Sequence, residues 1–255
     1  MLLRRVIEHV KTQNWTAVRI DFVIVVVGVF IGIQVSNWNA ARLDAAREVE
    51  YLQALGRDVR ESIGFANEIT TSLGEVRAAQ AALADHIQAI HPLSPDELER
   101  ALHQGLYPLA TLEVSLATWE ELKTAGATPL LRDRDLRFAL QELDSRLAQV
   151  RQSEADKSEI FYRFSDPYLI ENFNLNKQWY AREDPGEERP FVFSRYDPTH
   201  DPGEALTTGE FRNILVYRFN ADSNQLDAIK HLQEQFVKID TMVRSRLEAL
   251  GAARP

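Results

Sequence analysis

The sequence of 255 residues contains no cysteine. Disulfides, thiolate metal sites, cysteine nucleophiles and covalent haem attachment are therefore excluded. The absence of cysteine suits an oxidising and a reducing compartment equally well, so it does not locate the protein.

A surplus of basic residues is lacking as well. Asp and Glu number 38 against 29 for Lys and Arg, and the formal net charge is -9. Binding to the phosphate backbone of a nucleic acid needs clustered Lys and Arg. We therefore expect no nucleic-acid partner.

Recognisable catalytic motifs are missing too. The chain has no nucleophile elbow, phosphate-binding loop, dinucleotide fingerprint or His-Glu-x-x-His motif. Its densest group of metal-binding residue types (Asp197, His200, Asp201 and Glu204) stands beside Pro and Gly, where Asp is typical of turns. We predict that the protein is not an enzyme and holds no metal or other cofactor.

Charged residues are absent from residues 22–41, a stretch of 20 residues. As a helix this stretch would be about 30 Å long, which matches the hydrocarbon core of a membrane. Residues 22–33 are wholly apolar or Gly, and eight of these 12 are Val or Ile. The alternatives are a buried strand or core helix and a cleaved signal peptide, although the residues that follow lack a small-x-small cleavage site.

The residues that flank this stretch favour a transmembrane helix over residues 20–41. Trp15 and Trp38 bracket it at a helical distance of roughly 35 Å, as the aromatic belts of a membrane protein do. Arg19 stands at one edge, where its long side chain can reach the interface. We therefore interpret Trp15, Arg19 and Trp38 as membrane-interface anchors.

The flanking charges also predict an orientation. More basic residues precede the stretch than follow it closely (Arg4, Arg5, Lys11 and Arg19 against Arg42, Arg47 and Arg57). This bias places the N-terminus in the cytoplasm. Residues 1–19 are then a cytoplasmic amphipathic segment, either on the membrane surface or as a solvated tail, and residues 42–255 form the domain on the other side.

Small residues recur every fourth position in the predicted membrane helix. Gly28, Gly32 and Ser36 lie on one helix face, and such a face lets two membrane helices pack closely. This pattern predicts a homodimer formed through the transmembrane helix.

The stretch from Asp21 to Asn39 resembles the N-terminus of a widespread bacterial family of single-pass membrane proteins without an assigned activity. In this family the membrane helix begins with an acidic residue and ends with Gln-x-x-Asn-Trp-Asn, which corresponds to Gln34 to Asn39 in this sequence. Weaker similarities are Trp-Glu-Glu-Leu-Lys-Thr-Ala-Gly at residues 119–126 and Phe-Arg-Asn-Ile-Leu at residues 211–215. The resemblance implies a bacterial inner membrane and a periplasmic C-terminal domain, and it implies no catalytic role.

Residues 42–255 carry apolar residues at three- and four-residue steps, which predicts an all-α antiparallel bundle that continues from the transmembrane helix. We expect the first helix to end at His91-Pro92. Predicted N-terminal caps are Ser94, Thr118, Asp133 and Thr207. In the helix after Asp133, Glu154 and Lys157 occupy positions of the apolar stripe. They could form a partly buried ion pair, but the interpretation we favour is that the stripe turns toward solvent there.

Residues 167–206 are expected to be an irregular insertion, because they contain five of the ten prolines and many aromatic residues. Residues 178–181 and 191–193 could pair as a small β-hairpin. Long loops of this kind are often functional, but the interpretation we favour is a structural cap whose aromatic residues cover the open end of the bundle.

Taken together, these features favour a membrane-anchored interaction or scaffold protein that binds another protein of the cell envelope. The alternative is an extracytoplasmic ligand-sensing bundle that works with a membrane partner, since the chain shows no second transmembrane stretch.

Overall fold

The computed structural model describes residues 15–173 and 202–252, and these residues contain helices and no strand. The helices are α2 (Trp15–Ile87), α3 (Pro95–Leu106), α4 (Ala117–Thr124), the 3-10 helix η1 (Thr128–Leu130), α5 (Arg134–Ile160), the π-helix η2 (Phe161–Ser165), α6 (Asp166–Asn172), α8 (Pro202–Thr207) and α9 (Gly209–Ala249). The predicted all-α class is confirmed. The predicted hairpin lies outside the described residues.

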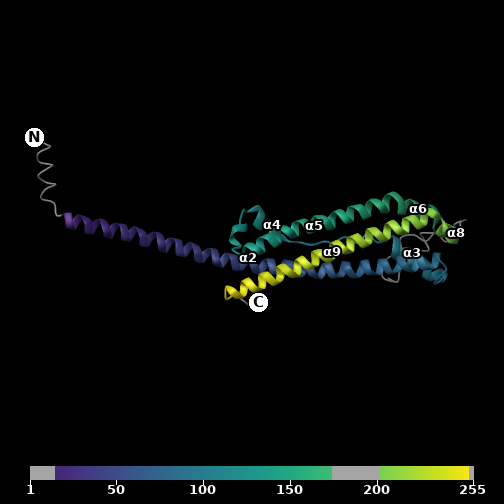
Figure 1. The fold of residues 1–255 in the computed structure, drawn as a ribbon, viewed down its shortest axis with the longest axis horizontal. Coiled ribbons are helices and arrows are strands. Elements are labelled where there is room, and N and C mark those ends of the chain that lie inside the picture. The colour runs from purple at the N-terminus through teal and green to yellow at the C-terminus, as the bar shows by residue number, and fades with distance from the viewer. Residues whose placement is uncertain (1–14, 174–201, 253–255) are drawn as a thin grey trace, which may run out of the picture. The chain divides into compact units, whose positions relative to one another are not determined.

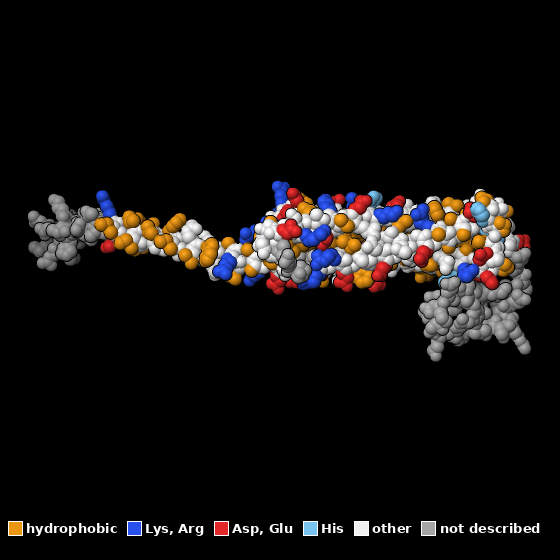
Figure 2. Space-filling view, turned by 90° about the horizontal axis from the view of Figure 1, so that it is seen from below, with side chains coloured by type: hydrophobic (Ala, Val, Ile, Leu, Met, Phe, Trp, Pro, Cys, Tyr) orange, Lys and Arg blue, Asp and Glu red, His pale blue; other side chains and the backbone are white. Residues whose placement is uncertain are grey.

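The chain divides into two units, an N-terminal unit of Met1–Tyr51 and a helical unit of Leu52–Pro255. In the N-terminal unit, every residue from 19 to 43 is exposed, and hydrophobic side chains cover this part of α2 (Figure 2). The segment is therefore neither a buried strand nor a core helix. Among the described residues, α2 is the helix that is long and apolar enough to cross a membrane.

In the helical unit α2, α5 and α9 lie side by side (Figure 1). Arg60 of α2 bonds Asp240 of α9, and further along α2 Gln80 bonds Asp222, so these two helices are antiparallel. In the same way, Ala139 of α5 lies beside Gln235 and Lys157 beside Gln225. The predicted antiparallel packing thus holds for α9 against both other helices, whereas α2 and α5 run in the same direction.

The parallel pair exists because residues 107–116, the crossover segment, return the chain along the bundle without helical structure. Gly105 lies just before the segment, where its carbonyl accepts a hydrogen bond from Gln80. Thr118 lies just after it, where its backbone N–H bonds the Asp58 carboxylate. Gln80 and Asp58 are 22 positions apart on α2, which is about 33 Å along the helix. The crossover segment therefore covers about this length of the bundle without forming a helix.

A hydrophobic core lies where α2, α3, α6, α8 and α9 meet. It is formed by buried Leu and aromatic residues, among them Leu83, Leu102, Leu169, Leu206 and Phe211. The ring centroids of Tyr168 and Phe173 lie 5.9 and 5.7 Å from that of Phe211. The predicted aromatic cap is therefore present for Tyr168 and Phe173, and its other members lie outside the described residues.

Two of the four predicted caps are found. Ser94 forms a full capping box with Glu97, and the Asp133 side chain accepts hydrogen bonds from the backbone of Asp135 and Leu136. Thr118 is not a cap, because α4 begins one residue earlier and Asp58 of α2 accepts from its N–H.

The predicted cap at Thr207 is also wrong, because α8 ends at that residue. Its neighbour Thr208 caps α9 by accepting from Phe211 N. The first helix likewise ends before the expected His91-Pro92, at Ile87. There Ala89 takes the left-handed conformation (φ 55°) that closes a helix end.

Pro167 does not end the helical region as its missing N–H would suggest. The π-helix Phe161–Ser165 widens the turn just before it, so Pro167 occupies the first turn of α6, where no N–H is needed. After α8, helix α9 runs without interruption from Gly209 to Ala249.

Candidate functional site

The residues that the sequence singled out in the membrane helix all lie on α2. Gly28, Gly32 and Ser36 are exposed on one face. Apart from chain neighbours and the backbone of the same helix, no described atom lies within 4 Å of a Cβ built at either glycine. Arg19 and Trp38 are also exposed, and Trp15 is the first residue of α2. This face is therefore open to a partner helix or to lipid.

A buried polar cluster in the helical unit is the second candidate site, and it was not predicted. Its members come from all three long helices. They are Gln80 of α2, Glu154 and Lys157 of α5, and Arg218, Asp222 and Gln225 of α9. The α9 residues are spaced by four and three positions, so they share the helix face that packs against α2 and α5.

Asp222 is the centre of this cluster. It is fully buried, and its carboxylate lies 3.7 Å from Lys157 Nζ and 3.7 Å from Arg218 Nη2, both of which are also buried. Gln80 Nε2 donates a hydrogen bond of 2.7 Å to Asp222 Oδ2. One carboxylate therefore faces two buried cations, and Glu154, which is partly buried, supplies the second negative charge of the cluster.

The cluster also holds the crossover segment. Arg218 Nη2 donates to Pro108 O at 3.0 Å, and Lys157 Nζ donates to Ala110 O at 3.0 Å. Gln225 Nε2 donates to the same Ala110 carbonyl. The backbone N–H of Leu112 donates to Glu154 Oε1 at 2.7 Å. Backbone N–H and C=O groups that are not part of a helix or sheet need other hydrogen-bond partners when they are buried. Here side chains of α5 and α9 are those partners.

Burial changes the acidity of both cations. It lowers the pKa of Lys157 to about 8, against the attraction of Asp222, and the nearby charge of Arg218 lowers it further. Burial also lowers the pKa of Arg218, which Asp222 partly offsets. Lys157 is thus the cation of the cluster that changes charge at about pH 8.

Several polar atoms of the cluster have no hydrogen-bond partner among the described residues. They are Arg218 Nε and Nη1, Asp222 Oδ1 and Gln80 Oε1. The Arg218 guanidinium instead lies 5.6 Å from the ring centroid of Phe161, the first residue of the π-helix. Unpaired buried atoms of this kind are sites where an internal water can bind.

Chemically, the cluster is suited to holding helices together rather than to catalysis. Lys157 is 1% exposed and Asp222 0%, so no substrate reaches them without movement of the bundle. The described residues contain no group of three or more His, Asp or Glu side chains placed to hold a metal. Residues 197–201 lie outside the described part of the chain.

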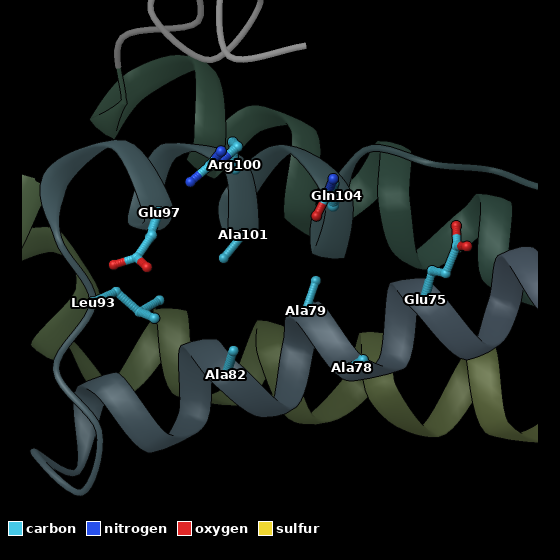
Figure 3. A pocket seen from close by; sticks show the side chains of 9 residues that line it. All are labelled: Glu75, Ala78, Ala79, Ala82, Leu93, Glu97, Arg100, Ala101 and Gln104. Atoms are coloured by element: carbon cyan, nitrogen blue, oxygen red, sulfur yellow. The ribbon is translucent and has the colours of Figure 1, made fainter. Parts of the chain in front are cut away.

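An open groove lies between α2 and α3 (Figure 3). Its volume is about 350 Å³. Ala78, Ala79 and Ala82 of α2 line one side, Ala101 of α3 lines the other, and Glu75 and Arg100 stand at its rim. It has room for a side chain of a partner, but it does not enclose a small ligand.

The preference for a solvated Glu154 and Lys157 is corrected by the structure. Lys157 is buried, and the carboxylate beside it belongs to Asp222, 65 positions away in the sequence. The signal that could have identified the cluster was the run of polar residues on the apolar face of α9, where Arg218, Asp222 and Gln225 interrupt a stripe of Leu, Ile and Phe.

Comparison of the chain with family models, with curated proteins and with solved structures finds no match.

Proposed function

We propose that the protein is a membrane-anchored helical interaction protein of the bacterial envelope, with no catalytic activity of its own. The observation that carries this proposal is the uniformly apolar and exposed surface of α2 over residues 22–33. Exposed apolar surface of this extent is unfavourable in water. Its ten strongly apolar residues would contribute on the order of -3 to -6 kcal/mol to membrane insertion.

The charge bias around this segment supports an N-terminus in the cytoplasm and a helical unit in the periplasm. The proposed family, in which the membrane helix exits through Gln-x-x-Asn-Trp-Asn, supports the same arrangement. In this reading Trp38 and Arg19 lie at the two interfaces of the inner membrane.

The surface of the helical unit supports a role in protein binding. It exposes several large hydrophobic side chains, each about half exposed or more, on η2 and on the first part of α9: Tyr162, Phe164, Val216 and Tyr217. Such residues are enriched where proteins bind each other. The polar cluster is closed to solvent and the groove between α2 and α3 is open, so neither resembles an enclosed ligand site.

The test of the proposed topology is a pair of C-terminal fusions in a bacterial host. A reporter active only outside the cytoplasm is expected to be active, and one that fluoresces only inside is expected to be dark. The reverse pattern would contradict the proposed orientation and direct the search for partners to the cytoplasm. Both fusions are compared at equal protein levels, so that poor expression is not taken for topology.

We further propose that two copies pair through Gly28, Gly32 and Ser36. Replacing both glycines by isoleucine (Gly28→Ile with Gly32→Ile) places bulky side chains on this face and is expected to abolish self-association in detergent. The matched control changes Val23 and Val27 to isoleucine, since these two residues lie on the opposite side of the helix. Crosslinking that is equal in the two variants and the wild type would exclude this interface.

A further inference from the structure

The crossover segment is held at its middle by Lys157. The Lys157 ammonium donates to Ala110 O of the segment and to Gln225 Oε1 of α9. The charged groups that face it are Asp222 and Arg218 from α9 and Glu154 from its own helix. From α2 the cluster receives uncharged Gln80, which bonds Asp222.

We propose that Lys157 is a proton-controlled clasp, in which protonation of its amine favours release of the crossover segment from α5 and α9. This inference does not depend on the proposed membrane role. It rests on the enclosure of Lys157, on its two hydrogen bonds, and on the bonds that tie the segment to the same cluster.

The closed state can keep its hydrogen bonds when Lys157 is neutral. A neutral amine still carries two hydrogens, and Lys157 makes two hydrogen bonds, to Ala110 and to Gln225. Asp222 Oδ1, at 3.7 Å, is beyond hydrogen-bond distance. Deprotonation therefore costs the attraction to Asp222 but relieves both the burial of a charge and the repulsion from Arg218.

The open state prefers the charged amine instead. Once the segment lifts and water reaches Lys157, its pKa returns toward the ordinary value of 10.5, whereas in the closed state it is about 8. Because the closed-state pKa is the lower one, the open state binds more protons between these values. The segment is therefore held more firmly as pH rises from about 8 toward 10.5.

Two backbone hydrogen bonds, one inside the segment and one just after it, provide a reporter and a control. The Leu112 N–H bonds Glu154, whose Oε1 also accepts a longer bond of 3.4 Å from Gln225, the partner of Lys157. The Thr118 N–H bonds Asp58 of α2, outside the cluster. Release at Lys157 should expose the first N–H and leave the second protected.

The experiment is hydrogen exchange of the full chain in detergent, resolved to single amides and corrected for the intrinsic rate at each pH. Between pH 7 and 9, above the ordinary pKa of histidine, the protection factor of Leu112 is expected to rise about tenfold while that of Thr118 stays constant. The variant Lys157→Arg, which stays charged throughout, is expected to show no rise at Leu112.

Three results would overturn the proposal. These are a Leu112 protection factor that is constant in the wild type, a rise of equal size in Lys157→Arg, and a parallel rise at Thr118. Lys157→Met, which cannot titrate, serves as the second variant if circular dichroism shows that the arginine variant is not folded. A tenfold rise that persists in Lys157→Met would equally exclude Lys157 as the clasp.

Discussion

Replacing Asp222 by asparagine is expected to lower the free energy of unfolding by about 3–5 kcal/mol, because removing one partner of a buried ion pair leaves uncompensated charge. Asp222 is the carboxylate that faces both Lys157 and Arg218 at 3.7 Å. Asparagine keeps the size of the side chain and an oxygen for the Gln80 hydrogen bond, so the loss reports on charge. Urea unfolding of the full chain in detergent, followed by circular dichroism, measures it.

The matched control is Asp240→Asn on the same helix. Asp240 pairs with Arg60 at 3.2 Å and Arg244 at 3.0 Å, but these arginine side chains are 48% and 61% exposed. Water screens such pairs, so the expected loss is about 0–1 kcal/mol. Asp240 is itself buried, so equal losses in the two variants would mean that the buried cluster stabilises the bundle no more than a carboxylate paired with exposed arginines does.

The sequence was sufficient to predict the long helices because each carries an apolar stripe with helical spacing. Leu52, Leu55 and Val59 of α2 are fully buried, as that stripe requires, and so are Leu136, Leu140 and Leu143 of α5. The caps at Ser94 and Asp133 were found because a cap bonds a backbone N–H only two or three residues away. Local spacing therefore specified these elements.

The pairing within the polar cluster could not be predicted, because its bonds join residues far apart in the sequence. Glu154 and Lys157 interrupt the stripe of α5, and sequence alone does not show that Asp222 faces Lys157. The carbonyls of Pro108 and Ala110 likewise accept hydrogen bonds from Arg218 and Lys157, which are distant in the sequence. The false cap at Thr118 has a related cause, since its N–H is bonded by Asp58, 60 positions earlier.

Placing two aspartates in the apolar segment, with Val26→Asp and Val29→Asp, is expected to abolish membrane integration. Each aspartate near the centre of a membrane helix costs about 2.5–3.5 kcal/mol, so the pair cancels the whole estimated gain of the segment. The wild type is expected to stay in the membrane pellet after extraction with alkaline carbonate, and the double variant is expected to appear in the supernatant or to be degraded.

The matched control places the same two changes on exposed valines of α9, with Val216→Asp and Val237→Asp. These side chains are 59% and 53% exposed, close to the 48% and 58% of Val26 and Val29, so the four positions are equally accessible in the isolated chain. If the apolar segment is the anchor, the α9 variant stays in the pellet while the α2 variant leaves it. If the α2 variant also stays, another surface holds the protein at the membrane, and the exposed aromatic residues near Tyr162 and Tyr217 become the first place to test.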